Sequence, residues 1–346
     1  MARLSMWKLW ILVLLCASVL EAASNKELEG FIGGNLKQNP NVELEKFTVI
    51  KRESVKGLSG WDKVEFKMDV KVGPQKMPNS KTDTLYTHKG LIAPELIMLS
   101  GENRTKTVSD DQLKTLAAQS VAGNPNVKLK SAEVVKRFPL KEAAGWEAVQ
   151  MEFALDVNQN GNMRSLSTTE VWFAGKNAVA PEIIRISSGS SLKYGIKGEV
   201  KPEHYAAERI IAGDRSGKAK YKIIVFSDPL CPACRKALPG LIDLAFKNPK
   251  EVSLYYYHKP VSAVSPVIMK AAIAQKLSGD TLAARALYEK EIKVQSPDEM
   301  AVLESYNKVM GTKFTMKDIN TPAVLAHFNQ DAKAAGELLI LGTPSI

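Results

Sequence analysis

The chain has 346 residues, of which 45% are hydrophobic and 24% are charged. This length and composition are those of a soluble globular protein with two or three domains. The formal net charge is +10, but the lysines are spread along the chain and form no tract interleaved with aromatic residues. This distribution argues against a nucleic-acid partner.

The N-terminus has the pattern of a secretory signal. Arg3 and Lys8 precede a short apolar run over residues 10–20, and small residues follow it. The run is shorter than the roughly 20 residues that a membrane-spanning helix needs. We therefore predict a signal peptide over residues 1–23, removed on export to a compartment in which disulfides persist.

The first half of the chain contains an internal repeat. The motif Asn-Pro-Asn-Val occurs at residues 39–42 and again at 124–127, and Gly-Trp occurs at 60–61 and at 145–146. We predict two α+β repeats, over residues 24–105 and 106–190. Each begins with a helix, capped by Ser24 in the first copy and by Ser109 in the second.

Strict alternation of apolar residues follows in each copy. It covers residues 64–72 and 149–157 and predicts antiparallel strands with one buried and one solvated face. Trp61 and Trp146 are predicted to be core residues. A linker with a short helix at 202–212 is expected over residues 191–218.

Residues 219–346 are predicted to form the catalytic domain. An apolar strand at 222–226 leads into Cys231-Pro232-Ala233-Cys234, and a helix containing Pro239 follows. A second strand is expected at 252–257. The rest is predicted to be mainly helical, with helices over residues 267–277, 281–292, 297–309 and 322–336.

The pair Cys231 and Cys234 is the strongest functional signal. Cys16 lies in the predicted signal, so these two cysteines are the ones that the exported protein keeps. A disulfide that closes so small a loop stabilises a fold little, which favours a chemical role. Placed at a helix start, the first thiol lies at the positive end of the helix dipole, which lowers its pKa and suits thiol–disulfide exchange.

At these residues the chain resembles a known family. Residues 224–234 are similar to the segment around the cysteine pair in the bacterial DsbG and DsbC disulfide isomerases, which carry it on a thioredoxin fold. The resemblance implies that Cys231 is the nucleophile and Cys234 the resolving thiol. It also implies that Thr343 and Pro344 form the threonine–cis-proline pair that receives the client backbone. Val225 stands where thioredoxins and DsbA carry a buried acid, which favours the isomerase branch.

The resemblance extends to the organisation of the chain. The repeats resemble the cystatin-like dimerisation domain of the isomerases, although those carry one copy. This implies either a homodimer through the repeats or an intramolecular pseudo-dimer. A thioredoxin sheet continues after the cis-proline with two more strands and a helix, so we expect these elements to be missing from this sequence.

The predicted function is that of a periplasmic disulfide isomerase or reductase without a cofactor. Its implied partners are unfolded or misoxidised exported proteins and a membrane electron donor of the DsbD type. A DsbA-like dithiol oxidase is the alternative, which Pro232 favours. Two further alternatives are a Cu(I)-binding protein that uses the dithiol and a chaperone. No metal site is predicted, and His258 is expected to be structural.

Overall fold

The computed structural model describes residues 23–73, 77–99, 107–159 and 162–346. The predicted signal peptide and Cys16 therefore lie outside the described residues, apart from Ala23 at its end. No helix in the described ranges is long and apolar enough to cross a membrane. The chain divides into two compact units, residues 1–196 and 197–346, which are described separately.

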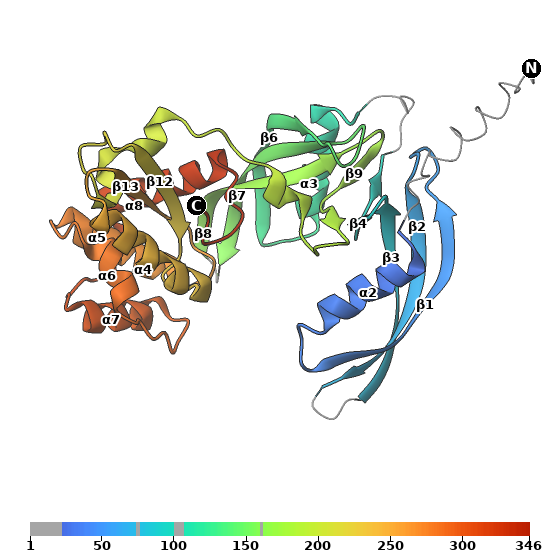
Figure 1. Cartoon of the computed structure of the whole chain (residues 1–346), viewed down its shortest axis with the longest axis horizontal. Helices are drawn as coiled ribbons and strands as arrows, with labels where there is room; N and C mark the ends of the chain where they lie inside the picture. Colours follow the sequence, from blue (N-terminus) through green and yellow to red (C-terminus); the bar gives the residue numbers. More distant parts are fainter. Residues whose placement is uncertain (1–22, 74–76, 100–106, 160–161) are drawn as a thin grey trace, which may run out of the picture. The chain divides into compact units, whose positions relative to one another are not determined.

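The first unit contains the same order of elements twice (Figure 1). One helix is followed by three long strands and two short ones. In the first copy these are α2 (Asn25–Leu36), β1 (Val42–Ser54), β2 (Asp62–Val72), β3 (Met77–His88), β4 (Leu91–Ala93) and β5 (Ile97–Met98). In the second they are α3 (Asp110–Ala122), β6 (Val127–Pro139), β7 (Glu147–Gln159), β8 (Asn162–Ala174), β9 (Ala178–Ala180) and β10 (Ile184–Arg185).

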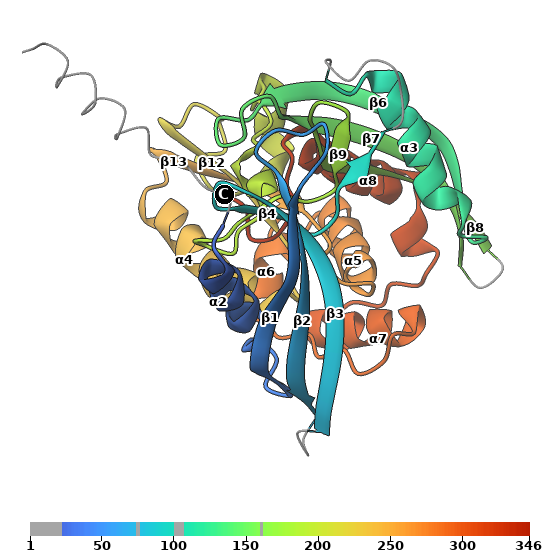
Figure 2. The same cartoon turned by 90° about the vertical axis from the view of Figure 1, so that its right-hand side faces the viewer.

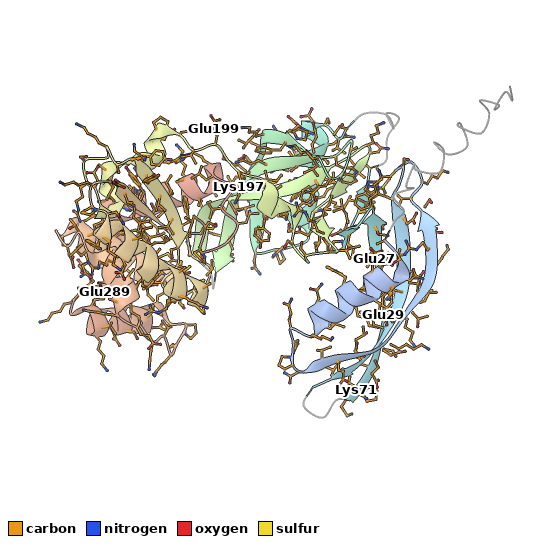
Figure 3. The ribbon with its side chains drawn as sticks, viewed as in Figure 1. Glu27, Glu29, Lys71, Lys197, Glu199 and Glu289 are labelled. Carbon is orange, nitrogen blue, oxygen red and sulfur yellow. The ribbon has the colours of Figure 1, made fainter. Side chains whose placement is uncertain are left out.

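Both predicted helix caps are present. The Ser24 hydroxyl accepts a hydrogen bond from the backbone N–H of Glu27, and the Glu27 carboxylate accepts one from the backbone N–H of Ser24. Glu27 and Glu29 lie along α2 (Figure 3). Ser109 and Gln112 form the same reciprocal box at the start of α3. These caps satisfy backbone donors that would otherwise be orphaned, so each helix begins at a defined residue.

Each helix packs on the alternating face of its sheet. In the first copy the long strands β1, β2 and β3 lie side by side with α2 beside them (Figure 2), and Leu28 of α2 is buried with Val64 and Phe66. In the second copy Leu113 of α3 is buried with Val149. The period-two alternation thus gives each copy one apolar face, which its helix covers.

The two copies exchange their last strands. The first sheet has the order β1-β2-β3-β4-β10 and the second β5-β9-β8-β7-β6. Ile184 of the second copy pairs with Ile92 of the first, and Ile97 of the first pairs with Val179 of the second. The buried rings of Trp61 and Trp146 meet across the copies with centroids 5.1 Å apart. The repeats therefore pair within one chain through backbone ladders and a shared aromatic contact.

The segment before the catalytic domain differs from its prediction. A 3-10 turn η1 (Leu192–Gly195) closes the first unit; η2 (Pro202–Tyr205) and η3 (Ala207–Arg209) replace the predicted linker helix, and β11 (Ile210–Gly213) follows. The helix prediction was wrong because Ile210, Ile211 and Ala212 are buried as a strand that pairs with β13. Part of the predicted linker thus belongs to the sheet of the second unit.

The second unit is built on a three-stranded sheet of order β11-β13-β12. β12 (Tyr221–Ser227) and β13 (Val252–His258) are parallel and are joined by α4 (Pro232–Lys247), whereas β11 is antiparallel to β13. The remaining elements agree with the predicted helical region: α5 (Ser265–Leu277), α6 (Ala283–Glu289), α7 (Glu299–Met310), η4 (Asp318–Asn320) and α8 (Pro322–Glu337).

The faces of this sheet carry separate cores. Val225 and Tyr256 face the larger core, which includes Leu238 of α4 and much of α5, α6 and α7. Tyr255 and Tyr257 face the other, which includes residues from the C-terminal part of α8. Burial on both faces explains why β12 and β13 lack the alternation of the repeats.

Candidate active site

The turn between β12 and α4 is fixed by a buried carboxylate. Asp228 is fully buried, and its two oxygens accept hydrogen bonds from the backbone N–H groups of Leu230 and Val261, each at 2.8 Å. These bonds join the turn before the cysteines to the loop after β13. The position of Cys231 is therefore set by the sheet edge and not by the turn alone.

Cys231 and Cys234 occupy the first turn of α4. Cys231 is the N-cap residue and half-buried, Cys234 is fully buried, and both thiols are free. Pro232 takes the first helical position, where its missing N–H costs no hydrogen bond. Pro232 and Ala233 are exposed. Cys231 is thus partly exposed to solvent, whereas Cys234 is enclosed in the core.

The environment lowers the pKa of the Cys231 thiol. Partial burial alone would raise it, but the backbone N–H of Cys234 and the Thr343 side chain outweigh that effect, helped by the Cys234 side chain and the N–H of Ala233. These donors lie at the N-terminus of α4 or face it, where negative charge is stabilised. The nucleophilic thiolate of Cys231 is therefore favoured over that of an ordinary cysteine.

The pKa of Cys234 is shifted in the opposite direction. Its burial raises the pKa more than the backbone N–H of Asp228 and the hydroxyls of Ser227 and Thr343 lower it. The pair thus combines a half-buried thiol of lowered pKa with a buried thiol of raised pKa. The thiol of lowered pKa is the one suited to attack a disulfide first.

Thr343 and Pro344 lie against the cysteine pair. The peptide bond between them is cis, and the Cys231 thiol donates to the Thr343 carbonyl oxygen with an Sγ–O distance of 3.5 Å. Ser345 exchanges two backbone hydrogen bonds with Phe226, which anchors this segment to β12. The Thr343 hydroxyl is buried without a hydrogen-bond partner in the described dithiol form. The structure thus brings all the predicted site residues together.

Several residues of the site were not predicted. Ser227 and Asp228 entered the sequence analysis only as part of the segment 224–234, and Tyr288 only as part of the predicted helix over residues 281–292. The Tyr288 hydroxyl donates to the Ser227 hydroxyl at 2.7 Å, and Tyr256 and Tyr288 share a hydrogen bond of 3.0 Å. The Ser227 side chain in turn lowers the pKa of Cys234. No local sequence pattern predicts these hydrogen-bonded hydroxyls, because they come from three separate elements, β12, β13 and α6.

His258 belongs to a separate buried cluster. Its Nδ1 lies 2.8 Å from Asp331, and Arg209 forms an ion pair of 2.5 Å with the other oxygen of that carboxylate. His258, His327 and Asp331 each have a side-chain atom that could bind a metal ion, and these atoms lie within 4.8 Å of one another. The positive charge that pairs with the Asp331 carboxylate is, however, the guanidinium of Arg209. Burial, followed by the charge of Arg209, lowers the pKa of His327 to about 3.

The second unit thus places a cysteine pair at the start of α4, beside a cis-proline and next to a three-stranded sheet. No family model and no curated protein matches the chain. Solved structures that are similar to it include Pseudomonas aeruginosa DsbA2, at 17% identity over 39% of this chain and 76% of that one, with a TM-score of 0.29. The catalytic domain of Proteus mirabilis ScsC is 20% identical over 40% of this chain and 76% of its own, with a TM-score of 0.33.

The chain is also similar, over a longer stretch, to the structure of Helicobacter pylori DsbG. The alignment covers 68% of this chain and 98% of that one at 15% identity, with a TM-score of 0.24.

Proposed function

We propose that the protein is an exported thiol–disulfide oxidoreductase, acting as a disulfide isomerase or reductase in the periplasm. The observation that carries this proposal is the pairing of a half-exposed thiol of lowered pKa, Cys231, with a buried thiol of raised pKa, Cys234. An asymmetric dithiol of this kind can attack a disulfide with one sulfur and close on itself with the other.

The reaction begins when the Cys231 thiolate attacks a client disulfide. A bond forms between Cys231 Sγ and one client sulfur, and the other client sulfur leaves as a thiolate. In isomerisation a client thiolate then attacks the mixed disulfide and restores the Cys231 thiolate. In reduction Cys234 attacks instead, and the client sulfur leaves as the Cys231–Cys234 disulfide forms.

The partners follow from this chemistry. The clients would be unfolded or misoxidised exported proteins, whose backbone would bind beside Thr343 and Pro344. After reduction the enzyme needs two electrons to reopen its own disulfide, and we propose a membrane donor of the DsbD type as their source. No cofactor takes part in the exchange.

The direction of the reaction can be tested by the reduction potential. The Cys231–Cys234 pair would be titrated in glutathione buffers, and rescue of a scrambled multi-disulfide protein would be measured with Cys231→Ser as the inactive control. We expect an intermediate potential, roughly −180 to −230 mV, together with rescue. A potential near about −120 mV without rescue would favour a DsbA-like oxidase. The absence of a reversible titration would favour copper binding or chaperoning.

A further inference from the structure

The buried thiol presents a chemical problem. Cys234 must become a thiolate to resolve a mixed disulfide, yet it has no exposed surface. Val225, which shares a core with Cys234, is apolar and fully buried. The titratable groups that face Cys234 are Cys231 on its own helix, Asp228 in the turn and Tyr288 on α6. Each Asp228 oxygen already accepts a backbone N–H, so this carboxylate is held in place by the turn.

A chain of hydrogen-bonded hydroxyls ends at Ser227, in the environment of Cys234. Tyr256 on β13 and Tyr288 on α6 are joined at 3.0 Å, and Tyr288 donates to Ser227 at 2.7 Å. Because the Ser227 oxygen accepts this bond, its own proton is free to point toward Cys234, whose pKa the Ser227 side chain lowers. Ser227 is fully buried, and the two tyrosines are nearly so.

Packing alone does not require the hydroxyls of this chain. Buried hydroxyls lower stability unless they are paired, and phenylalanine would supply the same packing without that cost. Here each hydroxyl is satisfied by the next, and the last one faces a sulfur that changes charge during the reaction. A donor aimed at developing charge stabilises it without reorganisation at the moment of reaction.

We propose that Ser227 is a catalytic hydrogen-bond donor to the Cys234 thiolate and that Tyr288 and Tyr256 are positioning residues that hold Ser227 in the donating orientation. The proposal deepens the proposed function and rests on it. In the resolving step the Cys234 thiolate attacks Cys231 Sγ, and the Cys231–Cys234 bond forms. The bond to the client sulfur breaks, and the departing client thiolate takes up the proton that Cys234 released.

The first test measures Cys234 without its partner. In a Cys231→Ser background the ionisation of Cys234 is followed by thiolate absorbance against pH. Adding Ser227→Ala should raise the pKa of Cys234 by about one unit, and adding Tyr288→Phe should raise it by about half as much. Ser227→Thr, which keeps the hydroxyl, should restore a value near that of the background variant.

The matched control is Tyr306→Phe. Tyr306 is fully buried in the same core, and its hydroxyl donates to Gln275 at 2.6 Å, but it has no link to Ser227. This substitution removes a buried tyrosine hydroxyl without touching the chain of hydroxyls, so the Cys234 pKa should not move. The proposal is overturned if Ser227→Ala and Tyr288→Phe leave that pKa where Tyr306→Phe leaves it.

The second test measures the resolving step in the intact dithiol. Rapid mixing with Ellman's reagent releases one thionitrobenzoate when Cys231 attacks and a second when Cys234 attacks the mixed disulfide. Ser227→Ala should slow the second release about tenfold and leave the first unchanged, because only Cys234 loses its donor. Equal slowing of both releases would contradict the proposal.

These measurements are independent of client turnover. If the unsubstituted chain rescues no scrambled protein but Ser227→Ala still shifts the Cys234 pKa, the proposed function fails and the donor role stands. If rescue is intact in Ser227→Ala and the pKa is unmoved, the donor role fails alone.

Discussion

Thr343 offers the cysteine pair two polar groups from one residue. Its carbonyl oxygen accepts the Cys231 thiol, while its buried hydroxyl lacks a partner in the dithiol form. That hydroxyl lowers the pKa of Cys231 and also opposes the rise in the pKa of Cys234. An unpaired buried donor is costly, but it becomes favourable when a thiolate appears beside it.

This arrangement predicts the pH dependence of Cys231. Its pKa lies below that of a free thiol, so reactivity should rise with pH to a midpoint lower than that of a free thiol. In a Cys234→Ser background, Thr343→Val should raise this midpoint by about half to one unit, because a donor to the thiolate is lost. Iodoacetamide alkylation rates against pH measure the effect.

Thr343→Ser provides the comparison for that experiment. It keeps the hydroxyl and should keep the midpoint. A profile that moves equally in Thr343→Ser and Thr343→Val would indicate altered packing and not a lost hydrogen bond. Either variant leaves the backbone carbonyl available to the Cys231 thiol.

The sequence alone predicts some residues of the site and not others. Cys231 and Cys234 are recognisable because their spacing is itself the signal, and Asp228 stands close by in the turn. Ser227 and Tyr288 are separated by 61 residues, and their hydrogen bond depends on where α6 packs. A hydroxyl pair of this kind has no sequence period, so only the tertiary arrangement reveals it.

At the scale of elements, Arg235 of α4 connects the site to the helical region. Its guanidinium donates to the carbonyl oxygens of Leu287 at 2.8 Å, Lys290 at 3.0 Å and Pro229 at 3.2 Å. The last carbonyls of a helix have no partner within it, so Arg235 satisfies the C-terminal end of α6. The same side chain holds the turn before the cysteines, which couples α6 and Tyr288 to the active site.

We therefore expect Arg235→Met to destabilise the protein by about 2–3 kcal/mol, since it leaves carbonyls without a charged donor while keeping the aliphatic volume. Urea unfolding of the oxidised and reduced protein measures this. The control is Lys333→Met on α8, which removes an exposed i,i+4 ion pair with Glu337 and should cost less than about 0.5 kcal/mol. Equal losses in the two variants would contradict the proposed role of Arg235.

Elements with a strong period were predictable, and the others were not. The alternation in β2 and β7 and the apolar spacing of α5 to α8 lead directly to the observed elements. β11 was missed because a run as short as residues 210–213 has no period, and its conformation is decided by the backbone of β13. The exchange of β5 and β10 was hidden for the same reason, since each has only two residues.

At the scale of the first unit, neither copy of the repeat is complete alone. Each sheet takes its last strand from the other copy, and Trp61 of one copy contacts Trp146 of the other. The copies therefore share an interface that would otherwise expose strand edges. The homodimer through the repeats remains a prediction, which sedimentation velocity would test against this intramolecular pairing.

The exchange predicts that the two copies unfold as one cooperative unit. Leu113→Ala creates a cavity in the second copy and should cost about 2–4 kcal/mol. Hydrogen exchange should then accelerate in β2 of the first copy as well as in β7. Ile273→Ala, a matched cavity in the second unit, should leave β2 unchanged. Faster exchange confined to the second copy would show that the copies unfold separately.

The contact between the two tryptophans is not symmetric. Trp61 stacks on His88 with centroids 5.3 Å apart, whereas Trp146 packs on Gly175, where a Cβ atom would lie 2.6 Å from the indole. In a homodimer each substitution appears twice, so the two halves of the interface must change together. Because both copies lie in one chain, a substitution can change one half of the interface and leave the other half unchanged. The two halves of the paired repeats therefore present different side chains around the two tryptophans, which two identical subunits in a symmetric dimer could not do.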